Sequence, residues 1–188
     1  MNYFNQVIVS GLLHHLKSGT KNHDYFAFSV RHEEDGRKDF LNARAFDPAI
    51  QEKLKSLQEN SPIRVKGVLH SSIGSGELYL AVQELDLESE TDSGELENSV
   101  KLSGDMHVIK AQTEGETGLG KYTRFAVKQE TQGTEGRVRR DFLVVRVYDE
   151  AMRNSLADKA DGQPITVEGT LRSSRGSGVN YVLCTKLD

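Results

Sequence analysis

The sequence contains no tryptophan, one cysteine and three prolines among 188 residues. The single thiol, Cys184, excludes an internal disulfide and fits a reducing compartment. No apolar run approaches the roughly 18 residues of a membrane-spanning helix, and the first residues have neither the basic nor the apolar region of a signal peptide. We therefore expect a cytoplasmic protein without a membrane partner.

Groupings of side chains that support catalysis or metal binding are also missing. The six histidines are scattered, with no cysteine or carboxylate at metal-ligand spacing around them. The sequence holds no nucleophile elbow, no P-loop and no paired carboxylates in a plausible arrangement. These absences predict a protein that is not an enzyme and that takes no metal or cofactor.

Charge of one sign is concentrated in only one short segment. The net charge is −4, of which residues 88–97 hold −5, residues 1–87 hold −1 and residues 98–188 hold +2. Neither long part has a strong basic field, so attraction for phosphate would depend on the local placement of cations.

What the sequence does contain is an internal repeat. Pro62–Gly76 matches Pro164–Gly178 with ten identities in fifteen, at an offset of 102 residues. Residues 39–47 match residues 141–149 at the same offset, whereas earlier blocks match at 93 and 97. The growing offset predicts extra residues, 4 and then 5, in two loops of the second copy. The predicted division is a domain at residues 1–87, an acidic linker at 88–97 and a domain at 98–188.

Each copy predicts five strands with one helix between the third and the fourth. Asp47 can cap a helix that begins at Pro48 and whose apolar face holds Ile50, Leu54 and Leu57. In the second copy Met152 and Leu156 occupy the places of Ile50 and Leu54. This order in about 90 residues is that of the OB-fold. The expected fold class is all-β with one short helix per repeat, as two tandem OB-fold barrels; an SH3-like barrel is the alternative. The expected strands of the first copy are residues 5–14, 25–32, 38–46, 62–70 and 77–85.

The third strand of each copy carries aromatic residues on the parity that points away from the core. Bases stack on such rings for about 1–3 kcal/mol each, and an arginine between them can meet phosphate. The alternative is that the rings pack under a loop or at an interface. This ladder consists of Phe40, Arg44 and Phe46 in the first copy and Phe142, Arg146 and Tyr148 in the second.

Further candidates for nucleic-acid contact lie on neighbouring strands and loops, where a solvated strand face or hairpin flank is the alternative for the charges. They are Tyr25, Arg31, Tyr122, Arg124 and Lys128 on the outward parity of the second strands, Arg139 and Arg140 before the third strand of the second copy, Arg172 on its fourth strand and Arg175 in the following Gly/Ser loop.

Ordered motifs in the second copy carry a resemblance to a known family. They are Asn98-x-Val100-x-Leu102-x-Gly104, Phe125-Ala126-Val127, Asp141-Phe142, a later Tyr148, and Val167-Glu168-Gly169-Thr170-Leu171. In this order the motifs resemble the bacterial single-stranded-DNA-binding protein family, with a looser match in the first copy. The resemblance implies that Phe142 and Tyr148, and by repeat Phe40 and Phe46, stack on bases.

The chain departs from that family in three ways, one of which is that the family's additional aromatic positions after the second and the fourth strand carry no aromatic residue here. The family usually stacks with tryptophan, and it recruits partners through a flexible tail, whereas this sequence ends at Asp188 directly after the fifth expected strand. A specialised role on plasmid, phage or mobile DNA, or in replication restart, is therefore expected. Because the family commonly works with four OB-folds, we also expect a homodimer in which the edges at residues 5–11 and 98–104 pair with another copy.

Three functions remain open from the sequence. A sequence-tolerant single-stranded DNA binder and a single-stranded RNA binder both agree with the aromatic–arginine ladder. An OB-based protein assembly module agrees better with the weak overall charge.

Overall fold

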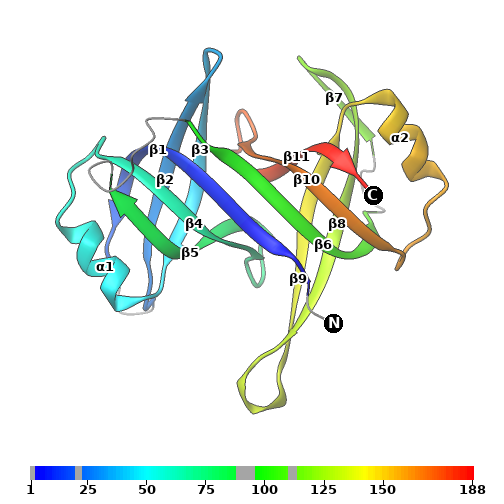
Figure 1. The fold of residues 1–188 in the computed structure, drawn as a ribbon. Helices are drawn as coiled ribbons and strands as arrows, with labels where there is room; N and C mark the ends of the chain where they lie inside the picture. Colours follow the sequence, from blue (N-terminus) through cyan, green and yellow to red (C-terminus); the bar gives the residue numbers. More distant parts are fainter. Residues whose placement is uncertain (1–2, 20–22, 88–95, 110–113) are drawn as a thin grey trace.

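The computed structural model describes residues 3–19, 23–87, 96–109 and 114–188. Its strands form two barrels that are joined in one continuous sheet, with the two helices at opposite ends (Figure 1). The first half contains β1 (Asn5–Lys17), β2 (Phe26–Glu34), β3 (Arg37–Ala45), α1 (Pro48–Lys55), β4 (Pro62–Ser71) and β5 (Leu78–Leu87). The second half contains β6 (Asn98–Val108), β7 (Glu114–Thr117), β8 (Gly120–Gln132), β9 (Val138–Val147), α2 (Glu150–Ala157), β10 (Pro164–Ser173) and β11 (Asn180–Leu187).

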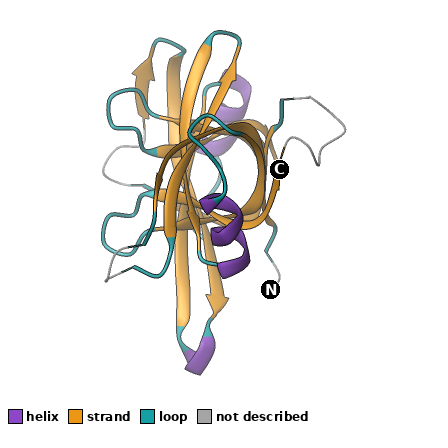
Figure 2. Cartoon of the chain, turned by 90° about the vertical axis from the view of Figure 1, so that its left-hand side faces the viewer, coloured by secondary structure: helices purple, strands orange, loops and turns teal. Residues whose placement is uncertain are grey.

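The strands of each half close on themselves. In the first half the order is β1, β2, β3, β5 and β4, which pairs again with β1. The contact of β3 with β5 is parallel and the other contacts are antiparallel. The second half repeats this order with β6, β8, β9, β11 and β10. Figure 2 shows a barrel viewed along its axis. With a helix before the fourth barrel strand, this is the OB-fold order, so the predicted fold class is confirmed.

The helices begin where the sequence predicts. The Asp47 carboxylate accepts a hydrogen bond from the amide of Ala49 at 2.7 Å, and the Asp149 carboxylate accepts one from Met152 at 2.9 Å. Such caps stabilise a helix start by about 1 kcal/mol. Ile50 and Leu54 of α1 are buried against the barrel, as the predicted apolar face requires.

A glycine lets the first strand of each barrel bend from one neighbour to the next. β1 pairs with β4 up to Leu12 and with β2 from Leu12 onward. A Cβ on Gly11 would collide with the Arg31 carbonyl, and one on Gly104 would collide with the Lys128 carbonyl. Only glycine permits this close approach, which closes the barrel.

The core lies inside the two barrels, on the parity that the alternation predicts. Leu41, Ala43 and Ala45 of β3 are at most 2 % exposed, and Leu143 and Val145 of β9 are fully buried. Their neighbours of opposite parity therefore point to the outside of the barrel.

The first strands of the two halves pair with each other. β1 and β6 are antiparallel, with Val7 opposite Val100 and Val9 opposite Asn98, and they lie side by side across the centre of the molecule (Figure 1). The prediction that residues 5–11 and 98–104 pair with another copy is therefore wrong. Once the chain is duplicated, each edge finds its partner within the same molecule.

The second half is larger in the two places where the repeat offset grows. The additional strand β7 precedes β8, and β8 and β9 continue together as far as Gln132 and Val138. In the first half the corresponding hairpin ends in the tight turn Asp35-Gly36, where both residues have positive φ.

The predicted linker, residues 88–97, lies mainly outside the described residues. Its described end is fixed to the first half, because the Glu97 carboxylate pairs with Arg64 and the Ser10 amide donates to the Glu97 carbonyl at 2.8 Å. Residues 1–87 and 98–188 remain our proposal for the two domains. Among the described residues, no helix is long and apolar enough to cross a membrane.

Candidate nucleic-acid interface

In the first half, an arginine of the predicted ladder lies between two tyrosine rings. The Arg44 guanidinium is 4.7 Å from the centre of the Tyr25 ring and 4.0 Å from that of Tyr79. It also donates a hydrogen bond to the Ser72 hydroxyl at 2.8 Å. We call this arrangement the sandwich. It holds a flat cation at the outer surface of the barrel through cation–π contact.

The second half contains the same sandwich with every member replaced by its repeat equivalent. Arg146 lies 4.8 Å from the Tyr122 ring and 4.0 Å from the Tyr181 ring, and it donates to the Ser174 hydroxyl at 2.8 Å. Four side chains have thus kept one geometry in both copies, although Tyr25 directly precedes β2 whereas Tyr122 lies within β8. Tyr79 and Tyr181, on β5 and β11, were missed by strand alternation, although both lie at the repeat offset of 102.

The aromatic rings of the ladder surround the sandwiches. Phe46 lies 5.2 Å from Tyr25, and Tyr148 lies 5.3 Å from Tyr122. Phe40 and Phe46 are 38 % and 42 % exposed. The rings therefore lie on the outer surface, as the alternation predicts, whereas Tyr122 is an exception at 8 % exposed because Arg146 and Tyr148 cover it.

Two histidines extend the aromatic surface, although the sequence indicated nothing special about them. The His14 ring lies 5.0 Å from Phe40, and the His107 ring lies 4.9 Å from Phe142. They are repeat equivalents at an offset of 93. This repeat offset is the feature of the sequence that could have identified the two histidines as a pair.

The predicted cations outside the ladder comprise surface groups, two partly buried arginines and two arginines that join the halves. Arg175 is exposed in the loop between β10 and β11, and Lys128 and Arg140 share the Glu130 carboxylate at 2.8 and 3.0 Å. The remaining members are Arg124, which lines a small cavity beside Arg146; Arg31, whose Nε is buried with no hydrogen-bond partner among the described residues; and Arg139 and Arg172, which lie at the junction.

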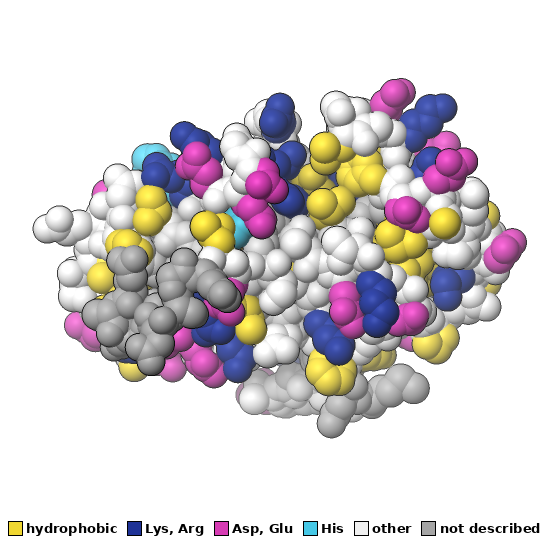
Figure 3. All heavy atoms as spheres, turned by 45° about the horizontal axis from the view of Figure 1, so that its top comes forward, with side chains coloured by type: hydrophobic (Ala, Val, Ile, Leu, Met, Phe, Trp, Pro, Cys, Tyr) yellow, Lys and Arg dark blue, Asp and Glu magenta, His cyan; other side chains and the backbone are white. Residues whose placement is uncertain are grey.

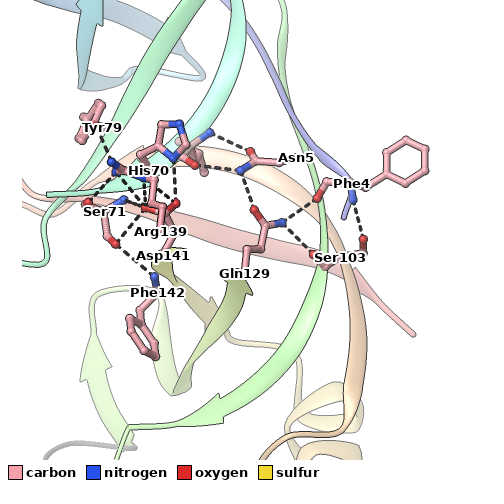
Figure 4. Close-up of polar contacts among 11 residues, drawn as sticks. Phe4, Asn5, His70, Ser71, Tyr79, Ser103, Gln129, Arg139, Asp141 and Phe142 are labelled. Atoms are coloured by element: carbon pink, nitrogen blue, oxygen red, sulfur yellow. Dashed lines mark hydrogen bonds and ion pairs between the residues drawn. The ribbon is translucent and has the colours of Figure 1, made fainter. Parts of the chain in front are cut away.

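At one side of the junction, Asp141 of β9 holds residues of the first half (Figure 4). Its carboxylate is 2.9 Å from His70 Nδ1, accepts the Ser71 amide at 2.8 Å and is bound by Arg139 at 3.0 Å. Arg139 also donates to the Ser71 carbonyl at 3.1 Å. Arg139 thus connects the halves instead of standing as a solvated hairpin flank.

The other side of the junction is the repeat equivalent. Asp39 of β3 is bound by Arg37 at 3.0 Å and by Arg172 of the second half at 3.1 Å. It also accepts the Ser173 amide at 2.9 Å. Asp39 and Asp141 are almost fully buried, so their charge depends on these partners.

The environment of Asp141 favours its ionised form. Burial raises the pKa of this carboxyl, but hydrogen bonds from His70, Arg139 and the Ser71 amide outweigh burial and lower the pKa to about 2. The pKa of Asp39 is also lowered: burial opposes the charge, but Arg37 and the Ser173 amide stabilise it.

The junction places an arginine of each half beside the sandwich of the other half. Arg139 of the second half donates to the Tyr79 hydroxyl at 3.3 Å. Arg37 of the first half interacts with Tyr181, and both line a cleft of the second half. The surface around each sandwich therefore contains residues from both halves of the chain.

That cleft has a volume of about 450 Å³ and lies between the β7–β8 turn and the β10–β11 loop. Figure 3 shows hydrophobic side chains beside lysine and arginine side chains on the upper part of one face. The described residues that line the cleft are Arg37, Thr117, Gly118, Leu119, Tyr122, Arg146, Tyr148, Ser174, Arg175, Ser177 and Tyr181.

Groups suited to metal binding or thiol chemistry are not gathered in the part of the chain that the structure describes. No three His, Cys, Asp or Glu side chains there are arranged to hold a metal ion. Burial raises the pKa of the Cys184 thiol to about 11, which disfavours the reactive thiolate.

Solved structures of other proteins share this architecture. No protein-family model matches the sequence, and no curated protein matches it. Among solved structures, a deletion mutant of the single-stranded DNA binding protein from Thermus aquaticus is similar over 99 % of this chain and 94 % of that chain, with 19 % identity and a TM-score of 0.70. The wild-type Thermus aquaticus protein is similar over 100 % of this chain and 93 % of that chain, with 17 % identity and a TM-score of 0.70. The chain therefore has, over its whole length, the tandem OB-fold architecture of that bacterial protein.

Proposed function

We propose that the protein binds single-stranded DNA with little sequence preference and is not an enzyme. The observation that carries this proposal is the sandwich, which recurs in both halves with outward aromatic rings beside it. Bases would stack on Phe40, Phe46, Phe142 and Tyr148, and phosphates would meet the edges of Arg44 and Arg146. Every base has a flat face, so such stacking tolerates any sequence.

The surface suits single strands better than duplexes. Bases of a duplex are already stacked on each other and present only their edges, whereas bases of a single strand can lie on aromatic rings. The net charge of −4 gives no general attraction for phosphate. Binding would therefore depend strongly on stacking, and only moderately on salt. The similar structures from Thermus aquaticus, which are named as single-stranded DNA binding proteins, support the proposal.

The test is a titration of the protein with single-stranded DNA, single-stranded RNA and duplex DNA of equal length at two salt concentrations. We expect the single-stranded DNA to bind most tightly. Tighter binding of RNA would make the protein an RNA binder. Absence of binding to all three would favour an OB-based assembly module, and equal binding of the duplex would contradict the stacking surface.

The arginines provide a second readout in the same titration. Arg44→Ala and Arg146→Ala together should weaken binding and flatten its dependence on salt, because two phosphate partners are lost. Lys186→Ala is the matched control, since this exposed lysine pairs with Glu168 at 3.5 Å, apart from either sandwich. An unchanged salt slope in the double variant would show that the DNA path avoids β3 and β9.

We further propose a cytoplasmic role in DNA replication, recombination, repair or the transfer of mobile DNA. A homodimer with four OB-folds also stays a proposal. Because β1 and β6 already pair within the chain, its interface must use another surface. Light scattering that gives the 20.9 kDa mass of one chain, with and without DNA, would contradict the homodimer.

A further inference from the structure

We infer that the cleft of the second half is a seat for one nucleotide unit of the bound strand, both its base and its phosphate. Among the described residues of the first half, the equivalents of a cleft arginine, a ring hydroxyl and β7 are missing, so the second half would anchor the strand. This inference rests on the proposed function and makes it more specific: the two halves would bind the same strand with different strength.

The size and lining of the cleft fit a nucleotide. Its volume of about 450 Å³ is in the lower part of the range for small-ligand sites, about 300–1,000 Å³. Its described lining contains three arginines, three tyrosines, three hydroxyl-bearing Ser and Thr residues and no carboxylate. Aromatic rings receive a base, and arginines with hydroxyl groups receive a phosphate.

The wall that would receive the base is held in place before binding. The Tyr148 hydroxyl is 3.1 Å from the Thr117 hydroxyl, and the Leu119 amide donates to the same Thr117 oxygen at 3.2 Å. These contacts tie the β7–β8 turn to the ring of Tyr148, whose centre lies 5.3 Å from that of the Tyr122 ring. Leu119 is 59 % exposed at the turn and adds apolar surface beside the ring. A ring fixed in this way loses little freedom when a base stacks on it.

The cations that would receive the phosphate come from three separate elements. Arg146 belongs to β9 and is fixed by Ser174, whereas Arg37 belongs to β3 of the first half and is fixed by Asp39. Arg175 extends from the β10–β11 loop and is exposed. Since all three line one cleft, a phosphate there would be approached from several sides.

The first half keeps the equivalents of Arg146 and Arg37, which are Arg44 and Arg139, but differs from the second half at three other points. Ile73 is the repeat equivalent of Arg175 and is 96 % exposed, so the loop cation is missing. Phe46 is the equivalent of Tyr148 and has no hydroxyl group. Within the described residues between β1 and β2 there is no counterpart of β7, and the repeat offset shows that the loop is four residues shorter.

Reciprocal substitutions test the inference in the full chain. Arg175→Ile makes the second loop like the first, and Ile73→Arg makes the first loop like the second. The probe is a fluorescein-labelled thymidine pentanucleotide, which is short enough to occupy a single half. We expect Arg175→Ile to weaken its binding about tenfold, because one charge-assisted phosphate contact is lost. Ile73→Arg in that background should restore part of the binding, and the control Ile73→Ala should change nothing.

The site of contact can be located independently. A pentanucleotide that carries 5-iodouracil should crosslink to Tyr148 more than to Phe46, as read by mass spectrometry. Pentanucleotide affinity that Arg175→Ile leaves unchanged, or crosslinks that fall equally on both halves, would overturn the inference. A long thymidine strand distinguishes this from failure of the proposed function, because it should still bind if only the seat is wrong. If free thymidine monophosphate competes as well as the pentanucleotide, the cleft takes a free nucleotide and its assignment to the strand is wrong.

Discussion

The guanidinium groups of Arg44 and Arg146 lie at the same distance, 4.0 Å, from the rings of Tyr79 and Tyr181. Around these two sandwiches the halves have diverged: Ile73 corresponds to Arg175, and His70 corresponds to Arg172. The sandwich has therefore been retained in both copies while its surroundings have changed. The halves thus carry two surfaces of one kind with different surroundings, joined by two ionic sites of unequal composition.

The largest expected effect concerns those two ionic sites. Asp39→Asn would remove the carboxylate that Arg37 and Arg172 share. Asp141→Asn would remove the carboxylate that Arg139 and His70 share. We expect each change to lower the free energy of unfolding by about 3 kcal/mol, the low end for buried pairs, because the arginines keep some contact with water. The Asp39 change should cost more, because Asp39 is bound by two arginines whereas Asp141 is bound by one arginine and one histidine.

Urea unfolding of both variants at pH 8 measures this difference. Equal losses would show that the junction is insensitive to the exchange of histidine for arginine. Losses below about 1 kcal/mol in both would show that the ionic sites contribute no more than surface ion pairs.

Lowering the pH should weaken the Asp141 ionic site in the unmodified protein and so lower its stability. The pKa of Asp141 is lowered from 3.8 to about 2, so its contribution to stability is present above pH 4 and is lost as the pH falls toward 2. This contribution corresponds to about 2 kcal/mol. The free energy of unfolding, measured between pH 5 and pH 2, should fall less steeply in Asp141→Asn. Parallel curves for the two proteins would contradict this role of the carboxylate.

Single ring deletions sharpen the comparison of the two binding surfaces. Phe40→Ala, Phe46→Ala, Phe142→Ala and Tyr148→Ala should each weaken single-strand binding by about 1–3 kcal/mol. Tyr148→Ala should have the largest effect because that ring also fixes the β7–β8 turn. Fluorescence titration gives the affinity and thermal unfolding gives the stability. A variant that unfolds, or a full set that binds normally, would show that the rings serve packing instead of stacking.

The smallest expected effect concerns the acidic segment between the halves. Glu97→Gln removes a partner of Arg64, which also pairs with Asp86 at 3.2 Å. Partly exposed pairs contribute about 0–1 kcal/mol, so the unfolding free energy should change by no more than that. Affinity for DNA should be unchanged or slightly higher, because a negative charge is removed. A clear loss of affinity would place this segment on the DNA path.

The fold was predictable because the signals that define it are local and repeated. Alternation in β3 and β9 separated the buried Leu41 and Leu143 from the outward Phe40 and Phe142. β7 was not predicted because its four residues, Glu114–Thr117, show no apolar alternation and pair only at one edge of β8.

The site was only partly predictable because its remaining members depend on tertiary contacts. Leu78, Tyr79 and Leu80 are all buried, so alternation gave no sign that Tyr79 covers Arg44. At the junction, Arg139 meets Ser71, which is 68 residues away in the sequence. An isolated basic stretch before a strand looks the same whether it binds phosphate or another part of the chain.

The pairing of β1 with β6 makes association of the two barrels a unimolecular event. Two separate chains joined in this way would come apart on dilution, whereas a covalent connection keeps their local concentration high at any protein concentration. A symmetric dimer must also repeat every contact twice. Here the Asn42 amide donates to the Asn180 side chain at 3.2 Å, while the equivalent positions hold Val144 and Leu78. The two barrels are therefore not interchangeable, and under the proposed function they would take different tasks along one bound strand.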